Sequence, residues 1–306
     1  MSDINIPDGR SLHPFLFMGC WNKEGGPRNA VAAAIQDDDV ETLILGGDNI
    51  YPEKFTRANG SKNSKYHLAV LDDGLKRLDK KTIYAALGNH NIVDPVVAAY
   101  ELELPWILPG SYYSLEFADK SAIIVLNTNL VANPEFTDMM RWFSETQREL
   151  QGKGIPYYLI HHEPFVSFKK EKIQMLLRGH DILETITYPP IAILCADTHN
   201  YQKGPLTYKD RFTVDQIVVG TGGAHYDKVT VPLGTVHEAN DMRYVLKEHE
   251  PGFGYLRVNV GNTEFRKVAD WSIQSADGRR NKKTRRRGSR SAHRNKQRSH
   301  KTRKHK

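Results

Sequence analysis

Seven residues of this sequence have side chains that could together hold a pair of metal ions, and each lies shortly after a predicted strand. Two divalent or trivalent cations about 3.5–4 Å apart can bind a phosphate ester, lower the pKa of a bridging water and stabilise both apical oxygens of an in-line displacement. Such a centre needs a shared carboxylate, further oxygen and imidazole ligands, and a group near the leaving oxygen. The residues that supply this inventory are Asp48, Tyr51, Asn89, His90, His162, Asp197 and His199.

The segment LILGGDNIY, residues 43–51, shows the pattern most clearly. Residues 42–45 are almost all apolar and predict a strand that is buried on both faces, as in a largely parallel sheet. Two glycines follow, and Asp48 comes directly after them, beyond the carboxyl end of the strand, where ligands bind in such sheets. An ordinary turn is the alternative for this segment taken alone, because Gly, Asp and Asn are turn formers.

The same design recurs at four other predicted strands, which favours one shared site over separate turns. Residues 14–20 end in Gly-Cys-Trp-Asn, and residues 82–87 are followed by Gly-Asn-His-Asn. Residues 157–160 lead to His-His-Glu-Pro, and residues 191–195 lead to Ala-Asp-Thr-His. A further strand at residues 214–219 ends in Gly-Thr-Gly-Gly. Because the carboxyl ends of parallel strands share one edge of a sheet, we expect these polar clusters to converge.

Predicted helices lie between the strands and should support them. They cover residues 29–35, 66–78, 92–104, 133–150 and 171–177, and a polar loop is expected at residues 52–65 near the site. Two hairpins are expected, at residues 112–128 and 255–268. Strands and helices alternate through the first two thirds of the chain, and strands dominate the last third. This order predicts an α/β (α+β) sandwich rather than a purely parallel doubly wound sheet.

Composition limits the class of protein. The 306 residues are 39% hydrophobic, which allows a substantial core in one large domain or two modest ones. No apolar run approaches the ~18 residues of a membrane span, and the N-terminus lacks the apolar middle of a signal peptide. Only two cysteines, Cys20 and Cys195, are present, which suits a reducing compartment. We therefore expect an intracellular protein, cytoplasmic or nuclear, that is not secreted and does not bind membranes.

The charge divides the chain into two unlike parts. Residues 279–306 hold 15 Lys and Arg and no Asp or Glu. Because the whole chain has a net charge of +7, the remaining residues have a net charge of −8. We expect a folded domain at residues 1–275 and a disordered basic tail at residues 276–306. Such a tail attracts RNA or DNA through their phosphates without reading sequence, and its clusters also resemble nuclear address signals. A plain solubilising tail is the alternative.

Taken in order, the motifs GDNIY, GNHN, HEP, ADTHN and GTGG resemble those of the calcineurin-like metallophosphoesterases. The spacing of Asp48 and Tyr51 resembles the purple acid phosphatase branch in particular. The resemblance runs from about residue 15 to about residue 271. It implies two packed β-sheets flanked by helices (α/β/β/α) and a hydrolase that uses two metal ions, with Fe, Zn or Mn expected.

The resemblance also implies a role for each candidate residue. Asp48 would bridge both metals, and the other ligands would divide between them: Tyr51 and His199 on the first metal, Asn89 and His162 on the second. His90 would lie beside the substrate phosphate, where it stabilises charge or protonates the leaving group. His161 is expected outside the ligand set, as a neighbouring or solvated residue.

Three positions depart from the family pattern. Cys20 stands where the family has a metal-binding aspartate, and a thiolate suits zinc or iron better than magnesium. Asp197 stands at the first histidine of the family's Gly-His-x-His, where it can still bind the second metal through oxygen. Asn91 replaces an acidic residue that would charge His90. The alternatives are a small buried apolar role for Cys20 and a turn cap for Asp197.

Two hypotheses about function follow. The first is a metal-dependent phosphoesterase that hydrolyses phosphate mono- or diesters with a metal-activated hydroxide, tethered to nucleic acid by its tail. The second is a catalytically degenerate protein of the same fold that acts as a nucleic-acid-associated binding module, because a fold does not guarantee an activity. The other histidines are expected to be structural or exposed, with His225 close enough to the glycines to touch substrate: His180, His225, His237 and His249.

Overall fold

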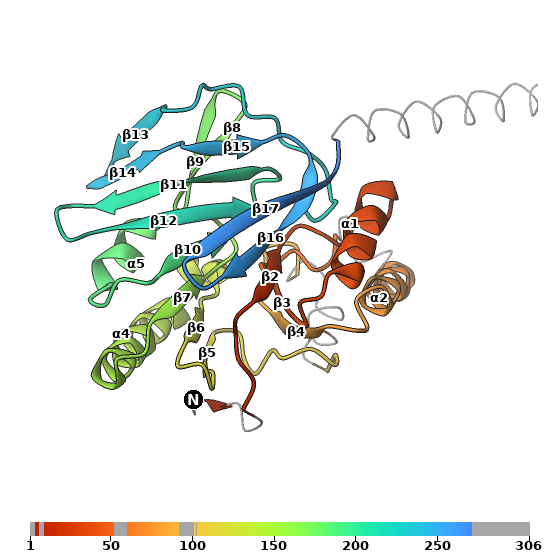
Figure 1. The fold of residues 1–306 in the computed structure, drawn as a ribbon, viewed down its shortest axis with the longest axis horizontal. Coiled ribbons are helices and arrows are strands. Elements are labelled where there is room, and N and C mark those ends of the chain that lie inside the picture. The colour runs from red at the N-terminus through yellow and green to blue at the C-terminus, as the bar shows by residue number, and fades with distance from the viewer. Residues whose placement is uncertain (1–3, 6–8, 52–59, 92–100, 102, 271–306) are drawn as a thin grey trace, which may run out of the picture.

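The computed structural model describes residues 4–5, 9–51, 60–91, 101 and 103–270, which form two β-sheets with helices on their outer faces (Figure 1). Most of the helix predicted at residues 92–104 and the tail predicted at residues 276–306, with its boundary, lie outside the described residues. The described helices are α1 (Gly26–Asp37), α2 (Gly60–Lys76), the 3-10 helix η1 (Thr128–Ala132), α4 (Glu135–Lys153) and α5 (Gly179–Thr185). None of them has the length and apolar character needed to cross a bilayer.

The first sheet has ten described strands and the second has five. The first sheet runs in the order β1 (Ile4–Asn5), β5 (Tyr113–Glu116), β6 (Ala122–Val125), β7 (Tyr157–Ile160), β10 (Ala192–Cys195), β12 (Phe212–Val219), β11 (Tyr201–Tyr208), β14 (Met242–Val245) and β13 (Val236–Ala239), and β15 (Glu248–Glu250) also pairs with β11. The second runs β17 (Asn262–Ala269), β16 (Phe253–Asn259), β2 (Phe15–Met18), β3 (Thr42–Leu45) and β4 (Thr82–Ala85). A separate hairpin is formed by β8 (Val166–Lys169) and β9 (Lys172–Met175).

Each sheet contains a block of parallel strands. In the second sheet, β2, β3 and β4 are parallel, with Phe17 opposite Ile44 and Ile44 opposite Tyr84. In the first sheet, β6, β7, β10 and β12 are parallel. The residues of β2, β3, β7 and β10 are all buried, as expected for strands covered on both faces.

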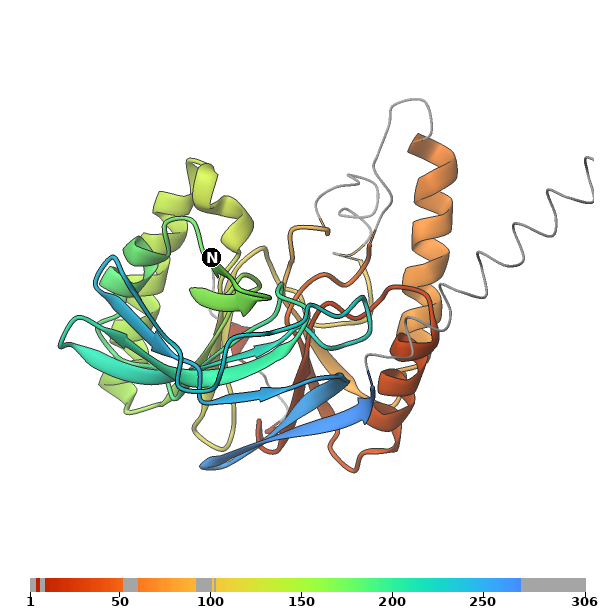
Figure 2. The ribbon, with the colours of Figure 1, turned by 90° about the horizontal axis from the view of Figure 1, so that it is seen from above.

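Alternation of side chains along β6 shows how the layers form. Ile123 and Val125 belong to the apolar core that also contains Phe17 of the second sheet. Ile124 belongs to a second core, which it shares with Phe143 of α4. Figure 2 shows α1 and α2 on one side of the sheets and α4 on the other. The protein therefore has the expected α/β/β/α arrangement.

Two predicted elements differ in the structure. Residues 171–177 do not form a helix, because β9 pairs with β8 and Lys172 lies opposite Lys169. Helix α2 begins at Gly60, so the predicted loop is wrong over residues 60–65, and residues 52–59 lie outside the described part. A stretch of seven residues is too short for its periodicity to separate helix from strand, so pairing with β8 decides.

Strand β11 was not predicted, although its eight residues pair with β12, β14 and β15 in the first sheet. It contains Gly204 and Pro205, which normally argue against a strand interior. Pro205 lies between the stretch of β11 that pairs with β14 and the stretch that pairs with β15, so its missing N–H removes no described ladder bond on that side. Gly204 is needed because an added Cβ would lie 1.8 Å from the carbonyl oxygen of Val245.

Candidate metal centre

The carboxyl ends of the two parallel blocks meet, and backbone hydrogen bonds hold them together. The Gly19 amide, after β2, donates to the carbonyl of Val219 at the end of β12 (2.9 Å). The Cys20 amide donates to the carbonyl of Gly47 after β3 (3.0 Å). The predicted convergence of strand ends is therefore present, and it joins both sheets.

Asp48 lies at the middle of this meeting point and is 1% exposed. The ligand atoms of Cys20, Asp48 and His199 all lie within 4.8 Å of one another. On its other side, Asp48 Oδ1 lies 3.3 Å from His162 Nε2, which in turn lies 3.7 Å from Asp197 Oδ1. One carboxylate thus lies between two groups of potential ligands, as a bridging role requires.

The first group consists of a thiol, a phenol and an imidazole. Tyr51 Oη lies 3.3 Å from His199 Nε2. Burial raises the pKa of Tyr51, and the neighbouring Cys20 and Asp48 raise it further. Burial also raises the pKa of the Cys20 thiol, helped by the carboxylates of Asp48 and Asp197. Both groups therefore stay protonated without a cation, whereas a bound cation would favour the deprotonated forms that serve as ligands.

The second group depends on the orientation of His162. Its Nδ1–H donates to the carbonyl of Gly46 (2.7 Å), which leaves Nε2 facing the carboxylates of Asp48 and Asp197. Within the described residues, Nε2 is a buried atom without a hydrogen-bond partner. Burial alone would lower the pKa of His162, but the facing carboxylates raise it to about 9. A ring held by a backbone carbonyl and aimed at two carboxylates is the arrangement of a metal-binding histidine, so these residues fit a cation.

Three candidate ligands have backbone in the left-handed region. The φ angles are 53° at Cys20, 53° at Asp48 and 45° at Asp197, each just after a strand. Aspartate tolerates this region, but cysteine rarely adopts it, and such conformations cost about 1–3 kcal/mol each. The strained turns direct three side chains into one place, which is typical of functional sites.

Two glycines allow the turns to approach so closely. Gly47 has a φ of 93°, and a Cβ there would lie 2.5 Å from His162 Nδ1. A Cβ at Gly88, after β4, would lie 2.4 Å from Asp48 Oδ1. Any larger residue at either position would displace a candidate ligand.

His90 and Asn89 occupy the turn after β4 and are placed differently. The His90 amide donates to Asp48 Oδ1 (2.9 Å), and its ring lies 4.8 Å from the ring of Tyr51, centroid to centroid. His90 Nδ1 is buried without a hydrogen-bond partner among the described residues. Asn89 is exposed, unlike the other predicted ligands, and its role as a ligand stays a prediction.

Two residues support the ligand turns in ways that the sequence did not predict. They are Asn91 and Glu101. Asn91 Oδ1 accepts hydrogen bonds from the amides of Asp48 (2.9 Å) and Gly88 (2.6 Å). Its Nδ2 donates to both carboxyl oxygens of Glu101, at 2.7 and 2.8 Å. Burial raises the pKa of Glu101 to about 8, although the Asn91 hydrogen bond opposes the shift. Asn91 therefore joins the backbones of two ligand turns, and no motif in the sequence pointed to Glu101.

His225 also has a larger role in the structure than the sequence predicted. Its Nε2 lies 2.8 Å from Nδ1 of His199, and Asp227 accepts from the His199 amide (3.3 Å). Burial and the neighbouring His225 lower the pKa of His199 to about 3, against the pull of Asp227. His225 thus contacts a candidate ligand, and only its position after Gly-Thr-Gly-Gly hinted at this.

Of the two roles expected for His161, burial excludes that of a solvated residue and leaves that of a neighbour of the ligand set. It is completely buried, and its Nδ1–H donates to the carbonyl of Glu163 (2.7 Å). Burial lowers its pKa to about 4. The two cysteines, Cys20 and Cys195, are buried and free.

Comparison with known proteins matches the chain by structure and not by sequence. No model of a known protein family matches it, and no curated protein matches it in sequence. A purple acid phosphatase, PPD1 from yellow lupin seeds, superposes with a TM-score of 0.58 at 14% identity, over 85% of this chain and 52% of that one. This chain thus spans about half of the lupin protein's chain.

Two further solved structures of similar size agree with this match. A dimetal phosphatase from Danio rerio has a TM-score of 0.52 at 9% identity, over 84% of this chain and 96% of that one. GAP50 of Plasmodium, described as the anchor in the inner membrane complex, has a TM-score of 0.55 at 14% identity, over 83% and 84%. The chain therefore has the fold of the calcineurin-like metallophosphoesterases, as the sequence motifs predicted.

Proposed function

We propose that this protein is a metal-dependent phosphoesterase that hydrolyses phosphate mono- or diesters at a binuclear centre. The observation that carries the proposal is the buried Nε2 of His162, which has no hydrogen-bond partner among the described residues and faces the carboxylates of Asp48 and Asp197. Without a cation or a bound proton, its lone pair would face negative charge. The phosphatases of the same fold support the same chemistry.

The ligands divide into two sets around Asp48. We assign Cys20, Tyr51 and His199 to the first metal and His162 and Asp197 to the second, with Asp48 shared. Two such ions would bind the ester oxygens and lower the pKa of a water between them. A thiolate ligand favours zinc or iron over magnesium and calcium.

The remaining residues orient the ligands and the substrate. His199 can bind a metal through Nε2 only if Nδ1 carries the proton, which His225 Nε2 is placed to accept in a hydrogen bond of 2.8 Å. Asn91 fixes the turns that carry Asp48 and His90. The His90 ring packs beside Tyr51, from where it can donate a hydrogen bond to a phosphate oxygen or to the leaving oxygen.

The test combines metal analysis with turnover of aryl phosphate mono- and diesters in the presence of Zn, Fe or Mn. The wild-type protein should bind two metal ions and hydrolyse at least one ester class. Asp48→Asn should lose metal and at least about 100-fold in kcat/KM, more than an outer partner would cost. Asp210→Asn, an exposed carboxylate in the turn between β11 and β12, is the matched control. A metal-free protein that is inert towards both ester classes would overturn the proposal.

A second candidate function is nucleic-acid association through the basic tail, with the globule as a scaffold or a tethered enzyme. The 15 Lys and Arg of residues 279–306 support it. Deleting residues 279–306 should remove salt-sensitive RNA or DNA binding and leave turnover unchanged if the protein is a tethered enzyme. A protein whose only activity is binding, lost on deletion and unaffected by Asp48→Asn, would be a binding module.

A further inference from the structure

A pocket of about 310 Å³ borders the candidate metal centre. Its walls come from three segments: η1 after β6, the turn after β7, and β9 with the two residues beyond it. The described lining residues are Thr128, Asn129, Val131, Glu163, Pro164, Gln174, Met175, Leu176 and Leu177.

Three of these residues connect the pocket to the ligand turns. Gln174 Nε2 donates to the Asp197 carboxylate. Asn129 Nδ2 donates to the carbonyl of Gly88 (3.2 Å), and Glu163 directly follows His162 in the chain. These links place a wall of the pocket next to Asp197 and His162, the candidate ligands of the second metal.

The lining has a distinct chemistry. It includes one carboxylate, Glu163, and no Lys or Arg among the described residues. Its other polar side chains are uncharged, from Thr128, Asn129 and Gln174, and Val131 and Leu176 add apolar surface. Burying a second phosphate or a carboxylate here would leave an unpaired charge beside Glu163. The pocket thus suits an uncharged group with some polar atoms.

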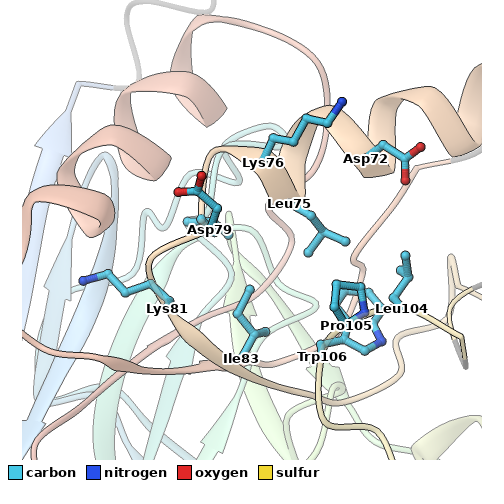
Figure 3. Close-up of a pocket in the computed structure, with 10 residues that line it drawn as sticks. Asp72, Leu75, Lys76, Asp79, Lys81, Ile83, Leu104, Pro105 and Trp106 are labelled. Atoms are coloured by element: carbon cyan, nitrogen blue, oxygen red, sulfur yellow. The ribbon is translucent and has the colours of Figure 1, made fainter.

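Its size limits the occupant further. Organic ligands occupy pockets of about 300–1,000 Å³, so a volume near the lower limit fits one small ring system with a sugar and excludes a duplex or a folded peptide. A second pocket of about 360 Å³ lies between α2 and β4 (Figure 3). Its described lining, which includes Asp72, Lys76 and Trp106, contains no neighbour in the chain of a candidate ligand, whereas the first pocket contains Glu163, next to His162, and Gln174, which donates to Asp197.

We propose that the pocket beside Asp197, the leaving-group pocket, holds the uncharged alcohol part of a small phosphate monoester, a group of nucleoside size. This inference rests on the proposed function, because the phosphate must lie on the metal centre. Hydrolysis breaks the phosphorus–oxygen bond to that alcohol. Water supplies the new oxygen on phosphorus, and its proton goes to the leaving oxygen, which gives phosphate and a neutral alcohol that the pocket can hold.

The first test compares leaving groups of different charge. A nucleoside 5′-monophosphate releases a neutral nucleoside, whereas the 5′-diphosphate releases an anion, and we expect at least about tenfold higher kcat/KM for the monophosphate. Val131→Lys places a cation in the pocket and should reduce or reverse this preference. Leu233→Lys, at a position 61% exposed and outside the pocket, should leave it unchanged. Equal kcat/KM values for both nucleotides in the wild type would overturn the inference and leave the phosphoesterase proposal intact.

A second measurement does not need turnover. Calorimetry should detect binding of a free nucleoside to wild-type protein and to Asp48→Asn, because the pocket does not require the metals. Val131→Trp fills the pocket and should weaken that binding at least about tenfold, whereas Leu233→Trp should not. Nucleoside binding without any ester hydrolysis would contradict the proposed function, and the pocket would then be a nucleoside site without a leaving-group role. Hydrolysis without nucleoside binding, or with a preference for oligonucleotides, would contradict the leaving-group pocket alone.

Discussion

Cys20 lies where its thiol reaches both the shared carboxylate and an imidazole, within 4.8 Å of Asp48 and His199. It also packs against Ala196 and Ala224, as a small apolar residue would. The left-handed backbone at Cys20 separates the two roles, because packing alone gives no reason to hold a cysteine in an unfavourable conformation. The position therefore favours a ligand.

Replacing Cys20 distinguishes the two roles by experiment. Cys20→Asp should retain both metals and extend binding to magnesium or manganese, because an oxygen ligand replaces sulfur and aspartate accepts the left-handed backbone. Cys20→Ala should weaken binding of the first metal by about 100-fold or more. Cobalt-substituted protein provides the readout, since a thiolate ligand adds a charge-transfer absorption that both variants should lose. Unchanged metal affinity in Cys20→Ala would show that the residue only packs.

Glu101 gives a prediction for pH, measured on the metal-free protein. Burial raises the pKa of Glu101 from 4.5 to about 8, so between these values the folded state holds a proton that the unfolded chain releases. The corresponding stability is fully present below pH 4.5 and is lost as the pH rises through about 8. Glu101→Gln, which cannot ionise, should flatten this fall in the free energy of unfolding between pH 5 and 8. Denaturant titrations across this range measure it, and an identical slope in both proteins would contradict it.

The local sequence is enough to recognise the candidate ligands, but it does not identify the residues that support them. Asp48, His162 and Asp197 each come within three residues of the end of a short apolar strand, so residue order alone was enough to single them out. Glu101 and Gln174 reach the site across the fold and belong to no motif. Contacts of that kind depend on how the elements pack, which the sequence pattern does not show.

At the scale of elements, the predictions were best for buried elements near the site, because complete burial requires an apolar sequence that is easy to recognise. Strand β7 was predicted with its observed bounds, Tyr157–Ile160, because a fully apolar run before a polar turn leaves little ambiguity. Hairpin β8–β9 was missed because both strands have only four residues and no residue of β9 is buried, so that tertiary pairing rather than local preference sets their structure. The error matters for function, because β9 carries Gln174 to Asp197.

Helix α1 is attached to the last hairpin through one carboxylate. The Asp38 side chain, at the end of α1, is completely buried and accepts from Arg257 (2.9 Å), Arg266 (2.8 Å) and the hydroxyl of Tyr255 (2.8 Å). Removing one partner from a buried ion pair costs about 3–5 kcal/mol, and less where the cations keep some contact with water. Because Arg257 and Arg266 are 16% and 36% exposed, the expected loss lies at or slightly below the lower end of that range.

Asp38→Ala should therefore lower the free energy of unfolding by about 2–3 kcal/mol, because it leaves two guanidinium groups with less compensation. The neighbouring Asp39, which is 80% exposed and also pairs with Arg257, provides the control. Asp39→Ala should have a much smaller effect, since exposed ion pairs contribute little. Urea unfolding of the two variants measures the difference, and equal losses would contradict a special role for the buried carboxylate.

At the scale of the whole molecule, alternating strands and helices followed by a strand-rich end predicted an α/β sandwich, and the family resemblance of the motifs implied the α/β/β/α layering. The order of strands was not predictable. Nothing in the local pattern shows that β16 pairs with β2, with Leu256 opposite Phe17, or that β12 ends beside Gly19. These long-range pairings bring the two parallel blocks together.

The pairing of β16 with β2 has a consequence for how the protein is made on the ribosome. Strand β2 emerges early, but its neighbour on one side, Leu256 to Val258, is among the last described segments to be synthesised. The amide of Gly254, in the same late strand, donates to the carbonyl of Thr221 (3.1 Å), in the loop that follows β12. The candidate ligands, from Cys20 to His199, are therefore synthesised before the strand that completes their scaffold. A chain that stopped before β16 would leave one edge of β2 unpaired and the turns that carry these residues without that support.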